Sequence, residues 1–471
     1  MEKQFKNLSK RSESQQPRKK MTFVKKIIVF FVAVCFCSAN IVGQEWRSAF
    51  TTVTLDNSGV LTVRGNGPMA DYHTGSTPRP WFNSRNNIRI VVIEQGVTSI
   101  GRNAFSDCTR LTSVTIPNSV ASIGVGAFYE CVSLTSINIP NSVTIIDVAT
   151  FYNCRSLTEI TIPGSVTKIG NQAFAGCSGL VKIKVEGRVP PLELENPATV
   201  VINVFQGLDL GFIYLEIPPG REAVYAGTAP WNFFSFEPQV KGNFSSYSWV
   251  YDIIERTFAI NGTGDLYNNT FANMSRFQSK VRSIVISNGF TSIGNNMFAG
   301  YSELTSVIIP NSVTSIGNGA FFGCRSLISV TIPNSVTSIG ARAFRGCWSL
   351  TQITIPRLVT SIMDGTFQNS GLVSIVIPNT ITSIGEDAFR NCGKLTEVTI
   401  PRSVRSIGNS AFQDCGALSK IVNHATTPQT INNSVFSGVS ATLYVPAASI
   451  DIYDSAAGWG MFHNIVEIQN N

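Results

Sequence analysis

Eight cysteines recur at one position of a repeated pattern, three residues after a phenylalanine, and are the first candidates for chemistry. They are Cys108, Cys131, Cys154, Cys177, Cys324, Cys347, Cys392 and Cys415. In an exported protein, regularly spaced cysteines can form disulfides, and clusters of four can bind zinc. Neither use fits well, because Tyr301 takes the same position in one copy and a column of like residues cannot surround a metal ion tetrahedrally. We therefore expect buried, free thiols that pack as small hydrophobic side chains.

The three histidines are weaker candidates for catalysis. They are His73, His424 and His463. None lies beside a recurring serine, cysteine or acid in a way that would suggest a catalytic triad. Asp71 and His73 are close together in a turn-rich segment, but two residues are a weak indication of a metal site. We expect no catalytic residue, no metal and no cofactor.

The cysteines belong to a sequence repeat whose first complete copy runs from 111 to 133. Leu-x-x-Val-x-Ile-Pro, Ser-Val-x-x-Ile-Gly and Ala-Phe-x-x-Cys return at the same offsets. Ten phenylalanines mark the copies, and within a block every step equals that from Phe105 to Phe128, except that Phe389 follows Phe367 one position early. A fixed period of this length predicts a solenoid, in which each repeat forms one coil and stacks on its neighbours.

Each coil is expected to begin with a short strand. Val114 and Ile116 alternate with Ser113 and Thr115, which is the two-residue periodicity of a strand with one buried face. Pro117 closes the strand, because proline has no N–H for the ladder and fixes its own φ. The apolar residues of each strand should therefore point into the coil and the polar ones outward.

The rest of the coil carries a second buried segment, but one coil cannot fold alone. Val120 and Ile123 face inward, and Gly124 permits the turn that brings Phe128 into the core. Burying the larger apolar side chains yields about 10–20 kcal/mol per coil, whereas ordering the backbone costs about 1–2 kcal/mol per residue. The coils must therefore share strand pairs with their neighbours, and each array needs a cap at both ends.

The charge of the chain is unevenly distributed. Its net charge is +7, and residues 1–26 alone contain nine basic and two acidic residues. Residues 27–471 therefore balance at 27 basic against 27 acidic side chains. Without a basic domain that would attract a polyanion, nucleic acid is not an expected partner.

The N-terminus is typical of an export signal. Lys25 and Lys26 precede the apolar run 27–37, which small residues follow. About eleven apolar residues suit a signal peptide and are too few to span a bilayer, which needs about 20. We expect cleavage between Ala39 and Gly43, and no membrane-spanning segment in the mature chain. The localisation that follows is secreted or cell surface.

The sequence also predicts an internal duplication. Residues 1–43 are the signal peptide with an N-terminal extension, 46–240 a first module with four coils, and 241–471 a second module with six. Each module has an N-terminal and a C-terminal cap. At the N-terminal caps, Trp249 matches Trp46 loosely. Both C-terminal caps contain Val-Phe-x-Gly, a strand ending in proline, a helical turn with tyrosine, and a closing Trp and Phe.

The repeat resembles that of the BspA-like leucine-rich repeat proteins, and residues 443–459 resemble their terminal segments. The resemblance covers about residues 46–471. It implies a β-rich leucine-rich repeat solenoid, an α/β repeat with short strands and helical turns, here in two tandem capped arrays. It also implies a secreted or surface-exposed protein of a host-associated bacterium, with adhesion to matrix proteins and cell aggregation as expected activities. The family has no catalytic residues to transfer.

The outward strand positions form the candidate binding face. On successive coils they would align about 4.8 Å apart. Their short polar side chains could simply solvate the sheet, with threonine favoured for its β-preference, or they could bind a protein. The candidates are Thr115, Thr161, Lys182, Lys184, Ile308, Thr331, Gln352, Thr354, Val376, Glu397 and Thr399.

The function expected from these features is adhesion to a host matrix protein or a microbial surface protein, by many weak contacts spread over a rigid face. One alternative is a structural or scaffold surface protein without a host ligand. A third, less favoured, is a secreted hydrolase with appended repeats, although repeats and caps leave no stretch for a catalytic domain.

Overall fold

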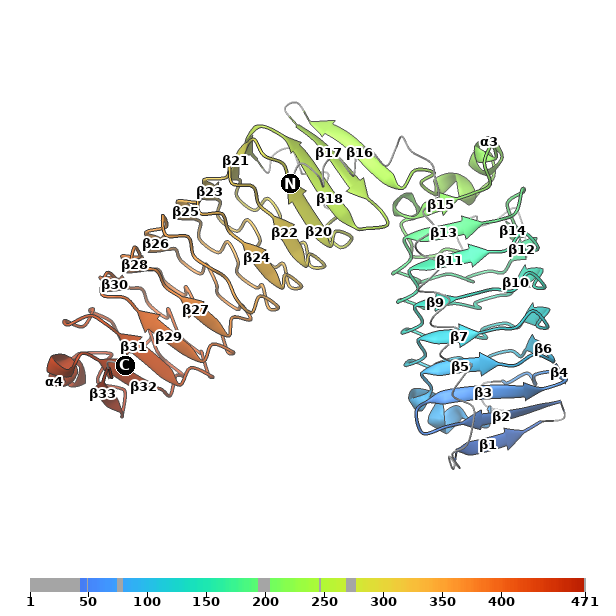
Figure 1. Ribbon diagram of the computed structural model, residues 1–471, viewed down its shortest axis with the longest axis horizontal. Coiled ribbons are helices and arrows are strands. Elements are labelled where there is room, and N and C mark those ends of the chain that lie inside the picture. The colour runs from blue at the N-terminus through green and yellow to red at the C-terminus, as the bar shows by residue number, and fades with distance from the viewer. Residues whose placement is uncertain are drawn as a thin grey trace. The chain divides into compact units, whose positions relative to one another are not determined.

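The described part of the chain forms two compact units, which divide between Pro238 and Gln239. In the computed structural model, the described residues are 43–48, 50–73, 79–193, 204–244, 247–267 and 277–469. The segment predicted to direct export lies outside these ranges. Each unit is a β-solenoid of stacked coils, with the first coloured blue to green and the second yellow-green to red in Figure 1. The predicted fold class is confirmed.

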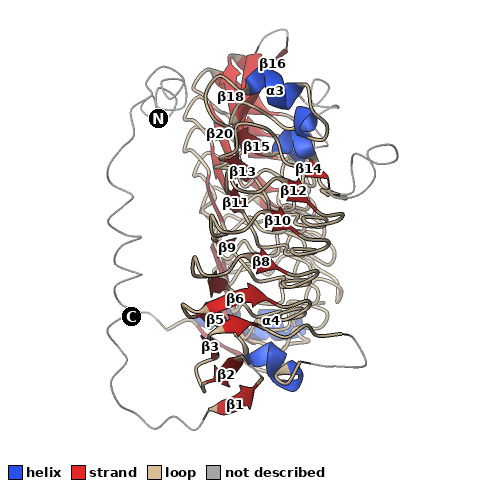
Figure 2. Ribbon diagram, turned by 90° about the vertical axis from the view of Figure 1, so that its right-hand side faces the viewer, coloured by secondary structure: helices blue, strands red, loops and turns tan. Residues whose placement is uncertain are grey.

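Two sheets run along the first array. The strands that precede the proline of each repeat form what we call the front sheet: β1 (Gln44–Arg47), β2 (Thr51–Leu55), β3 (Val60–Gly65), β5 (Ile90–Ile93), β7 (Ser113–Thr115) and β9 (Ser136–Ile137), then β11 (Glu159–Ile162), β13 (Lys182–Val185) and β15 (Tyr214–Glu216). The Ser-Ile segments form the back sheet: β4 (Gly67–Pro68), β6 (Val97–Ile100), β8 (Ser122–Ile123), β10 (Ile145–Ile146), β12 (Lys168–Ile169) and β14 (Leu192–Glu193). Figure 2 shows these strands as short segments joined by long turns.

The second array repeats this arrangement. Its front sheet contains β16 (Gln239–Phe244), β17 (Tyr247–Asp252), β18 (Thr257–Gly262), β20 (Ser283–Ile286), β22 (Ser306–Ile308) and β24 (Ser329–Thr331), then β27 (Ser374–Val376), β29 (Glu397–Ile400), β31 (Lys420–Asn423), β32 (Thr442–Val445) and β33 (Ile465–Glu467). Its back sheet contains β19 (Gly264–Leu266), β21 (Phe290–Ile293), β23 (Ser315–Ile316) and β25 (Ser338–Ile339), then β26 (Ser361–Ile362), β28 (Ser383–Ile384) and β30 (Ser406–Ile407). Both sheets are interrupted at the coil that contains Thr354, which keeps a single bridge to Val376.

Strand pairing follows the repeat period. Ser113 pairs with Ser136, and Ser306 with Ser329, so parallel partners lie one full repeat apart in the sequence. Where the phenylalanine step is one position shorter, the back-sheet partners Ser361 and Ser383 are closer in the sequence by the same amount. The omission therefore lies in a turn, and the pairing of this coil with the next one stays in register across it.

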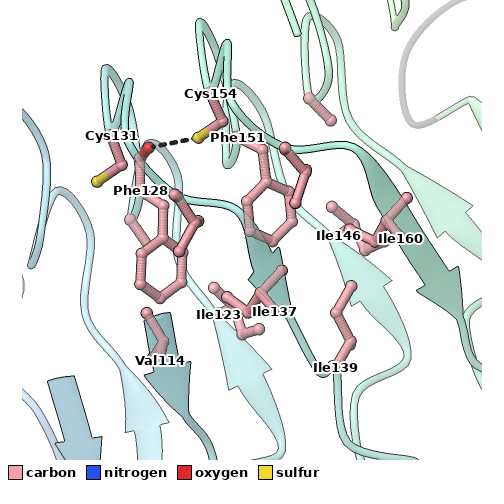
Figure 3. Close-up of a cluster of buried hydrophobic side chains, with 14 of the residues drawn as sticks. Val114, Ile123, Phe128, Cys131, Ile137, Ile139, Ile146, Phe151, Cys154 and Ile160 are labelled. Atoms are coloured by element: carbon pink, nitrogen blue, oxygen red, sulfur yellow. Dashed lines mark hydrogen bonds between the residues drawn. The ribbon is translucent and has the colours of Figure 1, made fainter. Parts of the chain in front are cut away.

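The predicted apolar positions of a coil are all buried: Leu111, Val114, Ile116, Val120, Ile123, Ala127, Phe128 and Cys131. The phenylalanines stack in a continuous column through each array, and the rings of Phe128 and Phe151 are 5.7 Å apart with their planes 3° from parallel. Figure 3 shows this pair above the isoleucines of the two sheets. Because each ring packs on the next, every coil needs its neighbours, as the energetic argument predicts.

The turns that carry the phenylalanines differ from the expected helical turns, because they are not helices. Residues with positive φ interrupt them, for example Asn103 at 52° and Asp107 at 54°. Their N–H groups bond across coils, as from Phe128 to the carbonyl of Thr150 at 2.9 Å, instead of four residues back along the chain. The α-helices of the described residues are α3 (Glu222–Ala226) and α4 (Ile450–Ser455), both in C-terminal caps. Each contains the tyrosine of the predicted helical turn.

The glycine at the end of the back strand is required for close stacking rather than for its φ. A Cβ on Gly124 would lie 2.7 Å from the backbone N of Arg102 in the preceding coil. Two coils have Asp147 or Met363 there, and both then carry a threonine three residues later. The hydroxyl groups of Thr150 and Thr366 donate to the carbonyls of Asp147 and Met363 at 2.7 and 2.8 Å. A second hydrogen bond thus fixes the turn where glycine is absent.

The two C-terminal caps have the same internal structure. Phe205 and Phe436, from the Val-Phe-x-Gly segments, extend the phenylalanine columns at 5.6 and 5.3 Å. Each cap also has a buried tyrosine and a buried tryptophan that donate to backbone carbonyls. The bonds are Tyr225 to Gly187 (2.8 Å), Trp231 to Pro191 (3.1 Å), Tyr453 to Ala425 (3.0 Å) and Trp459 to Gln429 (2.8 Å).

At the N-terminal caps, the loose match of Trp249 with Trp46 is wrong. Trp46 lies on β1 and pairs with Val53, whereas Trp249 lies on β17, the strand equivalent to β2, and pairs with Gly242. Gly242 therefore takes the place of Trp46. A Cβ on Gly242 would collide with the ring of Trp249. Each hairpin thus has one tryptophan opposite a smaller residue, but on different strands.

Candidate interaction surface

The repeated cysteines are buried and free, as predicted. In seven of the eight, the Sγ atom donates to the phenylalanine carbonyl of the preceding coil, for example from Cys131 to Phe105 at 3.1 Å. Desolvation by burial raises the pKa of the Cys108 thiol to about 12. A thiol that stays protonated is a poor nucleophile and a poor metal ligand. The column is therefore a structural feature of the core.

The histidines lie on the surface and do not meet acidic partners in a cluster. His73, His424 and His463 are exposed. The carboxylate of Asp71 accepts the N–H of Arg102 at 2.7 Å, which gives it a structural role in the cap. Within the described ranges, no group of three or more His, Cys, Asp or Glu side chains is placed to hold a metal ion. Among the same residues, no helix is long and apolar enough to cross a bilayer.

On the predicted face of the first array the outward residues are in register, but the charges of its lysines are paired with glutamates of the same array. Thr161 lies between its column neighbours Asn138 and Lys184, and Thr115 is exposed on β7. Lys182 forms an ion pair with Glu216, and Lys184 one with Glu186 at 2.8 Å. The hydrogen bond that the Lys184 ammonium donates to Glu186 raises the pKa of this lysine. The lysines therefore present less free charge than the sequence suggests.

On the second array, the predicted residues lie in two outward columns. One column contains Ile308 paired with Thr331 and, after the interruption of the sheet, Thr354, Val376 and Thr399 in register. Gln352 and Glu397 belong to the other column, and Glu397 faces Lys420 at 3.7 Å. Ile308 is half-buried, whereas Val376 is 77% exposed. A valine so exposed, in a column of threonines, is the most unusual side chain of this face.

Two further apolar residues of the front sheet were missed by the sequence argument. Ile328 is 56% exposed and Val373 is 42% exposed. They lie one residue before the outward position, where other coils of this array have Thr305, Thr351 and Thr396. Comparing each column with its own consensus would have found them. Together with Val376 they give this sheet three exposed aliphatic side chains, which we call the aliphatic set.

A basic edge of the second array was also missed. Where the front strands end at proline, most coils continue with asparagine, but two have Arg357 and Arg402. Arg402 lines a surface depression with Arg405 and His424, and Arg357 lines the neighbouring one. We call these four residues the arginine edge. Its sequence signal is again a departure from the repeat consensus.

A family model described as the BspA type leucine rich repeat region matches in six copies, over residues 77–193, 264–392 and 360–456. These ranges cover more than half of the chain and include coils of both arrays. No curated protein matches the chain.

Several solved structures are similar to the chain over most of its length. A leucine-rich repeat protein from Eubacterium ventriosum is 20% identical, with 91% of this chain and 96% of that chain covered and a TM-score of 0.32. A leucine rich cell surface protein from Faecalibacterium prausnitzii is 25% identical, with 82% and 96% covered and a TM-score of 0.24. A leucine-rich repeat protein from Bacteroides ovatus is 23% identical, with 82% and 94% covered and a TM-score of 0.26.

Proposed function

Because the chain belongs to the BspA-type leucine-rich repeat family, we propose that it is an exported or cell-surface protein whose front sheets bind a protein ligand. The ligand class is a host matrix protein or a surface protein of another microbe. Signal-directed export through residues 1–43 is part of this proposal. The chain acts by binding rather than by catalysis, because the described residues are taken up by coils and caps.

The observation that carries the proposal is the aliphatic set on the front sheet of the second array. Ile328, Val373 and Val376 replace threonines of their columns. Exposed aliphatic side chains on an otherwise polar sheet gain free energy when a partner covers them, about 25 cal/mol per Å² of apolar surface. Apolar side chains that a partner covers, surrounded by polar ones, are typical of protein interfaces.

A non-adhesive scaffold protein is the second candidate. It is favoured by the short polar side chains at most outward positions, such as Ser113, Ser136, Ser306 and Ser329, which would suffice to solvate the sheet. A scaffold would use its front sheets for neighbours on the same surface and would bind no matrix protein.

The experiment measures binding of the full chain to immobilised matrix proteins and to intact neighbouring cells. The test variant changes the aliphatic set to the threonine of each column, Ile328→Thr, Val373→Thr and Val376→Thr. We expect binding at least about tenfold weaker, which is 1.4 kcal/mol. The control, Met363→Gly with Phe322→Ala, removes two exposed apolar side chains elsewhere and restores residues that other coils use.

Control and wild type should bind equally. If the wild type binds no matrix protein and no cell surface, adhesion is wrong and the scaffold function remains. If the front-sheet variant binds as tightly as the wild type, adhesion occurs through another face.

The two arrays also permit bivalent binding. Two weak sites on one chain raise the apparent affinity when both can be engaged at once. The second module alone should therefore bind a dense ligand surface more weakly than the full chain. Equal affinity would show that one array carries the whole interaction.

A further inference from the structure

Two neighbouring depressions follow the edge of the second array at which the front strands end. One has a volume of about 600 Å³ and is lined by Asn334, Arg357 and Val376, among others. The next has a volume of about 650 Å³ and is lined by Arg402, Arg405 and His424, among others. Asn379 lines both depressions, so that they form one elongated surface along the stack of coils.

The charge of this surface has one sign. Among the described residues that line the depressions, three are arginines and none is acidic. No ion pair within the described part of the chain involves Arg357, Arg402 or Arg405. By contrast, the lysines on the front sheet of the first array are paired with glutamates. Three guanidinium groups are therefore available for an anionic ligand.

The basic character is specific to this array. In the first array, the residues after the strand-ending prolines are Asn118, Asn141 and Gly164. In the second array, Asn311, Asn334 and Asn379 keep the consensus, and Arg357 and Arg402 depart from it. The requirements of the coil do not explain the arginines, because asparagine and glycine satisfy the same backbone position elsewhere in this chain.

One hydroxyl group on this edge lacks its usual partner. In other coils the hydroxyl that follows this position donates to a carbonyl of the preceding coil, as Ser165, Ser335 and Thr380 do to Val143, Val313 and Val359 at 2.7, 2.6 and 2.9 Å. Ser403 lies between Arg402 and Arg405, and its buried Oγ has no hydrogen-bond partner among the described residues. Leaving a buried hydroxyl without a partner costs free energy. A ligand that supplies one would recover that free energy.

We propose that this edge of the second array binds an extended acidic peptide segment, whose carboxylates pair with Arg357, Arg402 and Arg405. An aliphatic side chain of the peptide lies over Val376, and its backbone bonds the amides of Asn334 and Asn379. Guanidinium groups bind carboxylates through two parallel hydrogen bonds. Arg357 and Arg402 are two coils apart, about 10 Å, which matches three residues of extended chain.

Val376 distinguishes a peptide from a sulfated polysaccharide. Its side chain is 77% exposed and lines the same depression as Arg357. A uniformly charged polysaccharide would gain nothing from contact with Val376. An acidic segment with one leucine or valine would pair its carboxylate with Arg357 and pack its aliphatic side chain on Val376. The inference rests on the proposed protein-binding function and names the chemistry of one partner segment.

The experiment uses the full chain and fluorescence anisotropy. The probe is a labelled, glutamate-rich peptide with one leucine, and the comparison probes are its glutamine counterpart and a labelled heparin oligosaccharide. The test variant is Arg357→Gln, Arg402→Gln and Arg405→Gln. The control, Arg282→Gln, Arg325→Gln and Arg345→Gln, removes equal charge from other parts of the same array, where Arg282 and Arg325 are exposed and Arg345 is half-buried. Circular dichroism checks that both variants are folded.

We expect the test variant to bind the acidic peptide at least tenfold more weakly than the control, and the glutamine peptide to bind neither. Val376→Thr should weaken the acidic peptide several-fold and leave heparin unchanged. Equal losses in test and control would mean unspecific attraction and overturn the inference. Loss of heparin binding alone would identify a polysaccharide site instead. If matrix proteins bind through the front sheet but the peptide does not bind, only this inference fails and the proposed function stands.

Discussion

The Sγ atom of Cys154 donates a hydrogen bond to the backbone carbonyl of Phe128, 3.2 Å away across the boundary between two coils (Figure 3). The same carbonyl accepts the N–H of Cys131 at 3.3 Å within its own coil. Each such thiol fills space in the core and satisfies one acceptor of its neighbour. The bond recurs from Cys177 to Phe151, Cys324 to Phe298, Cys347 to Phe321, Cys392 to Phe367 and Cys415 to Phe389.

The first prediction tests this bond. Cys154→Ala should lower the free energy of unfolding by about 1–3 kcal/mol, because it leaves a cavity and removes a donor. Cys154→Ser should cost less, since its hydroxyl can donate to the same carbonyl. Ser370 takes the equivalent position in another coil, with its Oγ 3.2 Å from the Sγ of Cys392. Urea unfolding monitored by circular dichroism gives both values, and equal losses would argue against the hydrogen bond.

The second prediction concerns alkaline pH. Burial raises the pKa of the thiols of Cys177 and Cys347 from 9.0 to about 12. Between these values the unfolded chain releases protons that the folded chain retains, so stability is complete below pH 9 and falls as the pH rises toward about 12. The loss approaches about 1.4 kcal/mol per pH unit for each thiol.

The urea midpoint, measured from neutral to alkaline pH, should therefore be flat and then drop steeply. A variant with alanine in place of Cys108, Cys131, Cys154 and Cys177 should show a smaller drop for the first array, although it starts from a lower stability. If the urea midpoint of that variant fell with pH as steeply as that of the wild type, groups other than these thiols would cause the loss of stability.

The third prediction compares two tryptophans of the second array. Trp459 is fully buried in the C-terminal cap, whereas Trp348 is 57% exposed on a coil. Trp459→Ala should destabilise the array by about 3–5 kcal/mol, because it opens the end of the phenylalanine column. Trp348→Ala should change stability by no more than about 0.5 kcal/mol. Thermal and urea unfolding measure both, and a severe effect of Trp348→Ala would contradict the assignment of that residue to the surface.

The fourth prediction compares two glycines. A Cβ on Gly340 would lie 2.5 Å from the backbone N of Asn318, whereas a Cβ on Gly393 would have no heavy atom within 4 Å. Gly340→Ala should therefore cost about 1–3 kcal/mol through overpacking. Gly393→Ala should be neutral or stabilise by up to about 1 kcal/mol, because it restricts the unfolded chain. If Gly340→Ala were neutral, the coils could separate slightly, and close stacking would not explain this glycine.

Much of the fold follows from the repeat period. The constant offset between copies predicts which strands pair, and the alternation around Val114 predicts which side chains are buried. The non-helical turns did not follow, because positive φ at residues such as Glu130 depends on hydrogen bonds between coils. The exchange between Trp46 and Gly242 was also missed. It requires knowing which strands of the two hairpins are equivalent.

The candidate surface was predicted less completely. Alternation placed Thr331, Thr354 and Thr399 on the outward face, where they lie. It could not reveal that Lys182 is paired with Glu216, a residue of a cap strand outside the repeat. The arginine edge lies beyond the strand, where the two-residue alternation no longer predicts which side chains face outward. It became visible only when the turns of successive coils were placed side by side.

The omitted residue near Ser370 leaves the pairing to the next coil intact, as Ser361 and Ser383 show. A gene duplication or deletion that adds or removes one whole coil would disturb the structure no more than this omission does. The N-terminal and C-terminal caps of an array could remain unchanged while the number of coils between them varies. Related chains can therefore differ in the length and area of their front sheets through inherited changes in coil number, while the fold stays the same.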